Sequence, residues 1–310
     1  MTHKSVTNLS ASVRQRLLNL SRQRQEEFNL LLSLYAIERL LYRLAQSPFA
    51  GQFILKGAIL FAVWTGRLHR PTHDLDLLGY GDDSAQTLTR TFQAVCQASV
   101  MPDGIEFDPQ SIRVTEIREG QEYGGQRISL NATLGTARIA VQIDVGFGDA
   151  VTPAASLTLY PTLLDFPAPT LRVYPKEAVV AEKLHAMVVH GLLNSRMKDF
   201  YDLWVLSQQF AFVGDTLAEA IAATFARRHT PLPDSLPLAL TAAFGDHPDK
   251  RIQWQAFLRR NHLEQSDIAF PTVIALLADF LALPLAAARA GVRMSAHWSA
   301  GGPWKTVDIS

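Results

Sequence analysis

The stretch LKGAILFAVWTGRLHRPTHDLDLL, from Leu55 to Leu78, ends in two aspartates inside an otherwise apolar run. Burying a carboxylate is costly unless a partner compensates its charge. In a β-strand, residues i and i+2 point to the same face, so Asp74 and Asp76 project together while Leu75 and Leu77 face a core. The pair is therefore either a metal site or two solvated acids on an edge strand, and a D-x-D pattern alone is short and common.

The residues around the pair favour binding of metal and phosphate. Lys56 and Gly57 lie at a predicted strand-to-helix turn, where backbone N–H groups are suited to binding phosphate. Arg67 and Thr72 follow on the connector and can contact phosphate. A third acid, Asp144 in VQIDVGFGD, lies on the polar side of a strand predicted to join the same sheet, although such an acid is as often a plain surface residue. Three carboxylates beside a glycine turn suit two-metal phosphoryl transfer.

A second dense cluster of charges lies in EKLHAMVVHGLLNSRMKDFYDLWVL, residues 182–206. Charges of both signs meet at a tight turn between two predicted helices, an arrangement suited to clamping a triphosphate and its metals. The alternative is a solvated helix hairpin whose acids favour the N-terminus of the second helix. The charged residues of interest are Lys183, Arg196, Lys198, Asp199 and Asp202.

Periodicity along the chain predicts an α+β fold, with a mixed sheet flanked by helices and followed by a helical C-terminal domain. We expect an N-terminal α/β domain over residues 1–174, a helical domain over 175–293 and a loosely packed tail over 294–310. The proline-rich segment 152–175 is expected to be a connection with one short strand. The predicted strands are 53–57, 74–80, 111–120, 125–135 and 137–149, and helices are predicted over 10–23, 26–47, 58–66 and 84–99.

Composition indicates a soluble globular protein. The chain has 310 residues, 48% of them hydrophobic, a formal net charge of +0 and one cysteine, Cys96, which excludes an internal disulfide and a cysteine-rich zinc site. We find no signal-peptide pattern and expect no segment long enough to cross a bilayer, because Asp279 and Pro284 interrupt the longest candidate, which we interpret as a buried helix pair. A cytoplasmic location without membrane association follows as an expectation. The chain also has no G-x-x-x-x-G-K-[ST] and no G-x-S-x-G motif.

Both clusters resemble motifs of one protein family. The stretch from Leu55 to Leu78 resembles the signature of the nucleotidyltransferase (DNA polymerase β-like) superfamily, and more closely that of the AbiEii/MenT-type toxin family, which reads K-G-G, a basic stretch and then T/S-x-D-x-D. E-K-L-x-A followed by R-x-K-D-x-x-D is similar to the second motif of that family, and the two occur in the expected order. One departure is Ala58 in place of the second glycine, where a methyl group either crowds the phosphates or requires an ordinary helical φ.

The resemblance implies a role for each matching residue. Asp74, Asp76 and Asp144 would hold Mg²⁺ or Mn²⁺, with Asp144 the third acid and base, and Lys183 would hold the phosphates of an NTP while the downstream aspartates orient it. Residues implied in catalysis are Asp74, Asp76, Asp144, Lys183 and Asp202. Those implied in nucleotide or phosphate binding are Lys56, Gly57, Arg67, Thr72, Arg196, Lys198 and Asp199.

The function that the resemblance implies is metal-dependent transfer of a nucleoside monophosphate from an NTP to an acceptor. The acceptor would be RNA, the 3′ end of a tRNA, and the protein would be the toxin of a bacterial toxin–antitoxin pair with a winged-helix antitoxin as partner. Phosphorylation of Thr72 would be one way to switch it off. Two alternatives stay open: the same fold modifying a protein or a small molecule, and a catalytically decayed module that only binds RNA or protein.

Overall fold

The computed structural model describes residues 8–117, 124–263 and 268–306 of the chain. The chain forms two compact units, Met1–Gly148 with Ser156–Val173, and Asp149–Ala155 with Tyr174–Ser310. The main division therefore falls beside residue 174, and the short segment 149–155 belongs to the second unit. An ion pair of 2.8 Å between Asp149 and Arg228 accounts for part of that placement.

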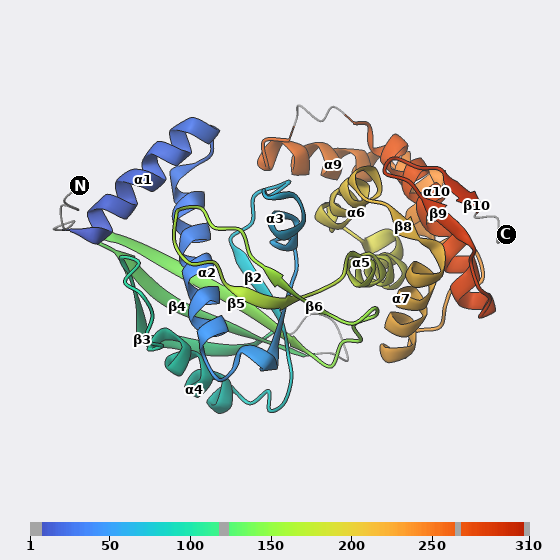
Figure 1. The fold of residues 1–310 in the computed structure, drawn as a ribbon. Helices are drawn as coiled ribbons and strands as arrows, with labels where there is room; N and C mark the ends of the chain where they lie inside the picture. The colour runs from blue at the N-terminus through green and yellow to red at the C-terminus, as the bar shows by residue number, and fades with distance from the viewer. Residues whose placement is uncertain (1–7, 118–123, 264–267, 307–310) are drawn as a thin grey trace. The chain divides into compact units, whose positions relative to one another are not determined.

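The first unit is built on a seven-stranded mixed sheet with the order β3-β4-β5-β2-β1-β7-β6 (Figure 1). The central strand β2 pairs antiparallel with β1 and parallel with β5, and β5 continues antiparallel into β4. The strands are β1 (Phe53–Lys56), β2 (Asp74–Gly79), β3 (Ile105–Ile117), β4 (Gly125–Leu134), β5 (Ala137–Phe147), β6 (Ser156–Leu159) and β7 (Thr170–Val173).

Helices α2 and α4 contact each other and the sheet, so they cover one of its faces. The long helix α2 lies across the strands in Figure 1 and contributes a stripe of fully buried leucines. Ser84, the first residue of the helix predicted over 84–99, is the N-cap of α4, because its hydroxyl accepts a hydrogen bond from the Thr87 backbone N–H. The helices of this unit are α1 (Leu9–Arg24), α2 (Phe28–Gln46), η1 (Ala50–Gln52), α3 (Leu60–Thr65) and α4 (Ala85–Cys96).

Two details of the sheet differ from the sequence prediction. The segment 152–175 contains two strands instead of one, because β6 and β7 pair as a hairpin and β7 then adds in parallel to β1. Strand β3 begins at Ile105 instead of residue 111, since an irregularity between Asp108 and Arg113 breaks the alternation that marks a strand. Residues 118–120 of that predicted strand lie outside the described residues.

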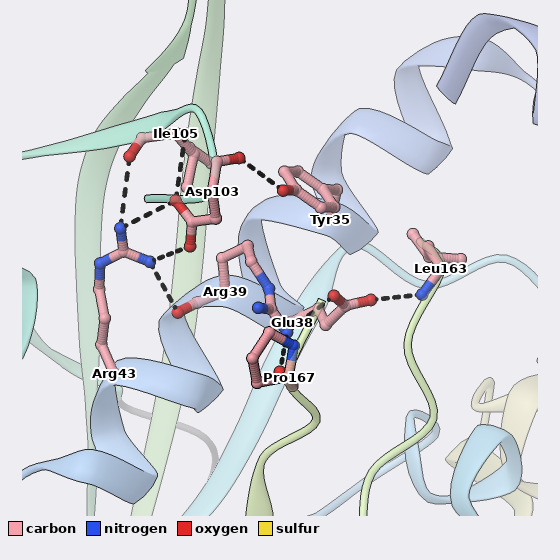
Figure 2. A network of polar contacts seen from close by, with 8 residues as sticks. All are labelled: Tyr35, Glu38, Arg39, Arg43, Asp103, Ile105, Leu163 and Pro167. Carbon is pink, nitrogen blue, oxygen red and sulfur yellow. Dashed lines mark hydrogen bonds and ion pairs between the residues drawn. The ribbon is translucent and has the colours of Figure 1, made fainter. Parts of the chain in front are cut away.

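Charged side chains of α2 are buried and hold the helix to two connecting segments of the chain, around Asp103 and Leu163 (Figure 2). Arg43 forms a bidentate pair with Asp103, at 2.7 and 3.1 Å, and the Tyr35 hydroxyl donates to the Asp103 carbonyl at 2.6 Å. Glu38 pairs with Arg39 and accepts a hydrogen bond from the Leu163 N–H at 2.6 Å. Burial raises the Glu38 pKa to about 7, against the opposing effect of Arg39.

The second unit is helical and has an aromatic core. Rings from four of its helices pack together, with Phe200 stacked on Phe244 at 5.5 Å between centroids and Trp254 against Phe270 at 5.2 Å. Its elements are α5 (Lys176–His190), η2 (Gly191–Leu193), α6 (Met197–Gln209), β8 (Phe212–Val213), α7 (Gly214–Arg227), η3 (Leu238–Leu240), α8 (Ala242–Gly245), α9 (Pro248–Arg260), α10 (Phe270–Ala290), β9 (Ala296–Trp298) and β10 (Trp304–Thr306).

The expectation of a loosely packed tail over 294–310 is wrong for its described part, residues 294–306. Strands β9 and β10 form a three-stranded sheet with β8. Trp298 is buried, and its indole N–H donates to the Ser207 carbonyl at 2.8 Å, while Trp304 stacks on Phe280. Trp298 and, in part, Trp304 remove apolar area from water, which holds this segment in place.

The apolar segment interpreted as a helix pair is one continuous helix, α10, with Pro284 inside it. Within the described residues, α10 is also long and apolar enough by length and composition to cross a membrane, contrary to our expectation for the chain. Leu277, Phe280 and Leu281 are fully buried, and α10 packs on α6, α7 and α8. Those contacts account for its apolar composition as that of a core helix.

Candidate active site

A row of four charged residues crosses the first unit's sheet. The strand registers place Lys56 of β1 opposite Asp76 of β2, Asp76 opposite Asp144 of β5, and Asp144 opposite Arg127 of β4. Paired residues on neighbouring strands project from the same face, so the charges follow the order plus, minus, minus, plus. The acids that the sequence placed near each other are thus direct neighbours in the sheet.

The predicted alternation of both acid-bearing strands is confirmed. Leu75 and Leu77, which alternate with the aspartates of β2, are fully buried, whereas Asp74 is exposed and Asp76 half-buried. In the next row Asp74 lies opposite Gln142, whose amide nitrogen donates to the Asp74 carboxylate at 3.0 Å. The polar face therefore holds Asp74 in a defined position beside Asp76.

The third acid has a cationic partner that the sequence did not reveal. The Arg127 guanidinium donates from Nε and Nη2 to the two carboxylate oxygens of Asp144, at 2.8 and 2.7 Å. Such a bidentate, charge-assisted pair is the strongest form of side-chain hydrogen bonding. Asp144 is therefore held by a guanidinium in this structure.

Gly57 packs directly against the carboxylate of Asp76. Its φ is +79°, and a Cβ built on Gly57 would lie 2.0 Å from Asp76 Oδ2. Only glycine combines that backbone conformation with that close approach. The turn between β1 and α3 is thus shaped around the acid pair, which gives the K-G sequence a structural reason.

Ala58 does not crowd this turn. Its side chain is buried in the core, and it is absent from the non-glycine residues with positive φ in the described chain. The backbone conformation there is therefore one that alanine adopts readily. The departure from K-G-G is accommodated by packing.

The basic connector is only partly available at the surface. Arg67 is exposed, whereas Thr72 is buried at 9% exposure. A phosphate donor reaches the Thr72 hydroxyl only if the connector moves, so the hypothesis of phosphorylation there requires an opening of residues 66–73.

The donor set suits a hard divalent cation held together with a nucleotide. Among the described residues, no three His, Cys, Asp or Glu side chains are grouped as metal ligands. Asp74 and Asp76 nevertheless project from one face of β2. Mg²⁺ in nucleotide-processing enzymes is commonly bound by one or two carboxylates plus substrate phosphates. The pair fits that mode, and would hold the ion with the phosphates completing its coordination.

The second cluster lies within the second unit and is centred on Lys183 of α5. Its ammonium donates to Asp199 at 2.7 Å and to Asp202 at 2.8 Å, and both acids of α6 are almost fully buried. Arg196 donates to the other Asp199 oxygen at 2.6 Å. Burial alone would raise the Asp199 pKa, but Lys183 and Arg196 hold it below its usual value.

A match to a known protein family extends over most of the chain. A family described as the nucleotidyl transferase AbiEii toxin of type IV toxin–antitoxin systems matches residues 39–278, which include both clusters. The chain belongs to this family. The expected membership is confirmed, and the AbiEii assignment supports a nucleotidyltransferase toxin of a toxin–antitoxin system.

Two solved structures are similar to the AbiEii chain. JHP933 from Helicobacter pylori shares 14% identity over 85% of this chain and 93% of that chain, with a TM-score of 0.49. A provisionally assigned nucleotidyltransferase from H. pylori shares 14% identity over 84% and 95%, with a TM-score of 0.46. Both likenesses are distant and carry no argument about the site. A comparison with curated proteins finds no match.

Lys198 stands apart from the other predicted residues of this AbiEii chain. It is exposed, and the ion pairs around Lys183 do not include it. The buried Asn194 does support the cluster, because its side-chain oxygen accepts from the Arg196 N–H at 2.8 Å. Lys250 of α9 in turn donates to the Asn194 carbonyl at 2.9 Å.

Sequence reasoning missed four contributors, namely Arg127, Gln142, Asn194 and Lys250. Strand alternation puts Arg127 and Gln142 on the polar face, so that part of the signal was present. It does not say which residue lies opposite which, because register depends on hairpin geometry. No local pattern links Lys250 to a residue 56 positions earlier.

Proposed function

We propose that this AbiEii chain transfers a nucleoside monophosphate from an NTP to an RNA acceptor, the 3′ end of a tRNA. The observation that carries the proposal is the row Lys56–Asp76–Asp144–Arg127, with Gly57 packed on the Asp76 carboxylate. The two neighbouring carboxylates of this row are flanked by a lysine and an arginine, so the row offers ligands for a cation and for phosphates. The glycine that accommodates the Asp76 carboxylate supports the same assignment.

The residues of the first unit would divide the work by position. Asp74 and Asp76 hold the divalent ion, Mg²⁺ or Mn²⁺, and Asp144 is the third carboxylate beside them. Lys56, next to Asp76 in the row, contacts the phosphates together with the Gly57 turn. Arg67 of the connector adds a further phosphate contact, and Thr72 does so only if the connector opens. The bound ion supplies stabilisation of the charge that develops on the phosphates.

Within the second unit, Lys183, Arg196 and Lys198 are a separate set of candidate phosphate ligands. The Lys183 ammonium is fixed in position, since it donates hydrogen bonds to Asp199 at 2.7 Å and to Asp202 at 2.8 Å. Arg196 is held against Asp199, and more than a third of its side chain is exposed, so its guanidinium is accessible to phosphate oxygens. Lys198, exposed on α6, adds positive charge at the surface of the same helix.

The reaction forms one bond and breaks one. The acceptor's hydroxyl oxygen attacks the α-phosphorus of the NTP, and the bond from that phosphorus to the bridging oxygen of pyrophosphate breaks. The hydroxyl proton passes to a carboxylate, for which Asp144 is the proposed base, and pyrophosphate carries away the negative charge.

Incubation with each labelled NTP and total tRNA tests the proposal, with wild type compared with Asp74→Asn. Glu106→Gln is a matched control, because Glu106 is an exposed acid on β3 of the same sheet. We expect label in tRNA from wild type and the control and none from Asp74→Asn. Label in protein or in a small molecule instead would replace the RNA acceptor, and equal labelling by Asp74→Asn would refute the assignment of the site.

We further propose a winged-helix antitoxin as the partner and the cytoplasm as the place of action. The family assignment to type IV toxin–antitoxin systems supports a partner. Co-expression with the product of the adjacent gene, followed by growth measurements, tests this. Growth arrest by the chain alone and rescue by that product are expected; rescue by an unrelated protein expressed at the same level would contradict the pairing.

A further inference from the structure

We propose that Arg127 is a positioning residue that withholds Asp144 from the metal site until nucleotide binds. The guanidinium pairs with the Asp144 carboxylate in this structure, and the phosphates of a bound triphosphate would draw it away. The inference rests on the proposed function, since it concerns how that same site is completed.

The pair uses the whole of the Asp144 carboxylate. Nε and Nη2 of Arg127 each donate to a different oxygen, at 2.8 and 2.7 Å, so both oxygens already have a cationic donor. The register of β4 and β5 places the two residues opposite each other, in a run of ten paired positions. The side chains are therefore held together by the sheet itself.

A divalent cation and this guanidinium compete for the same oxygens. A cation bound to Asp144 would lie close to the positive charge of Arg127, and the two charges would repel each other. Asp76 and Asp144 are direct neighbours in the sheet, so a cation held by Asp76 would also be near this pair.

Arg127 is placed to exchange its carboxylate for a phosphate. Its side chain is 41% exposed, against 21% for Asp144, so the guanidinium is the more accessible member of the pair. The planar fork that binds a carboxylate with two parallel bonds also binds a phosphate in that way. A triphosphate arriving with its metal ion thus supplies the new anion for Arg127 and the cation for Asp144 in one event.

Titration calorimetry of Mn²⁺ binding to the full chain, without nucleotide, tests the proposal independently of catalysis. We expect Arg127→Gln to bind Mn²⁺ about tenfold more tightly than wild type, as expected for loss of one competing interaction. Arg113→Gln is the matched control: Arg113 lies on β3, and its guanidinium donates to the backbone carbonyls of Gln110 and Ile112. That variant removes the same charge from the sheet and should leave Mn²⁺ affinity unchanged.

The Asp144→Asn background shows whether the effect passes through Asp144. In that background Arg127→Gln should no longer change Mn²⁺ affinity. If Arg127→Gln tightened Mn²⁺ binding equally in that background, or if Arg113→Gln tightened it equally, the effect would come from the loss of any positive charge. Either result would overturn the proposal. Equal affinities in wild type and Arg127→Gln, or no Mn²⁺ binding by either, would also overturn it.

A non-hydrolysable NTP analogue gives the second arm. It should tighten Mn²⁺ binding to wild type more than to Arg127→Gln, because only wild type has an inhibitory pair to release. An equal effect on both proteins would overturn the nucleotide-driven release. Neither arm depends on transfer to an acceptor, so a chain that binds Mn²⁺ as expected and labels no tRNA would refute the proposed function alone.

Discussion

Replacing Gly57 by alanine places a methyl group on the carboxylate of Asp76. The ideal Cβ position lies 2.0 Å from Asp76 Oδ2 and 2.7 Å from its carboxyl carbon, far inside van der Waals contact. The φ of +79° adds strain, because an L-residue in the left-handed region costs roughly 1–2 kcal/mol. The variant therefore carries two penalties, one from its own backbone and one from displacement of the acid.

Gly66→Ala separates those penalties. Gly66 has a φ of +78° at the C-terminus of α3, and a Cβ there meets nothing within 4 Å. In this control only backbone strain is introduced. Its free energy of unfolding should fall by about 1–2 kcal/mol, and its activity should be unchanged. Gly57→Ala should lose at least as much stability, and its transfer rate should fall about 100-fold, since a displacement of about 1 Å at a reacting centre has that effect.

Urea denaturation and initial rates of nucleotide transfer measure the two quantities on the same preparations. The reasoning predicts similar or larger loss of stability in Gly57→Ala than in Gly66→Ala, with activity lost only in Gly57→Ala. If both variants kept wild-type activity, the close contact with Asp76 would have no part in catalysis. If both lost it equally, backbone strain near α3 would explain the result and the contact would not.

Three further predictions concern buried ionisable groups. Lys183→Met should lower the free energy of unfolding by about 3–5 kcal/mol at pH 7, because two buried aspartates lose their cation. Urea denaturation of Lys198→Met, at an exposed position, should show little change. Equal losses in the two variants would refute the pairing. The Glu38 pKa is raised to about 7 in the folded protein, against 4.5 in the unfolded chain, so its stabilising contribution should fall as pH rises from about 4.5 to 7. Glu38→Gln should therefore flatten this part of the pH profile of urea midpoints. Parallel profiles for the variant and wild type would contradict the prediction. Burial raises the Cys96 thiol pKa to about 12, so alkylation at pH 8 should be slow in the folded protein and fast in urea, as mass spectrometry would show; rapid labelling of the folded chain would count against that environment.

Local sequence patterns predicted most elements of the first unit. Alternation in DLDLL and VQIDV fixed which side chains face the core, and the structure confirms both faces. Ser84 marked the start of α4 correctly. These predictions succeed because side-chain direction in a strand, and capping in a helix, depend on residues only a few positions apart.

Predictions failed where long-range packing decides the conformation. The last described residues are held by Trp298, which is buried, and Trp304, which is partly buried; their indole N–H groups donate to carbonyls of α6 and α10. Strand β6 pairs with β7, and α10 continues through Pro284 while it packs on α6, α7 and α8. In each case the stabilising partner is distant in sequence, so the local pattern does not contain it.

By itself the sequence determined the family, the mixed sheet and the identity of the acids, because motif spacing and periodicity are local properties. Only the tertiary structure decided their pairing. Register across four strands brings Lys56, Asp76, Asp144 and Arg127 into one row, although the last two lie 17 residues apart and on different strands. Since a shift of one residue in register would turn a strand's side chains to the opposite face, the bond between Asp144 and its guanidinium partner is a property of the folded sheet.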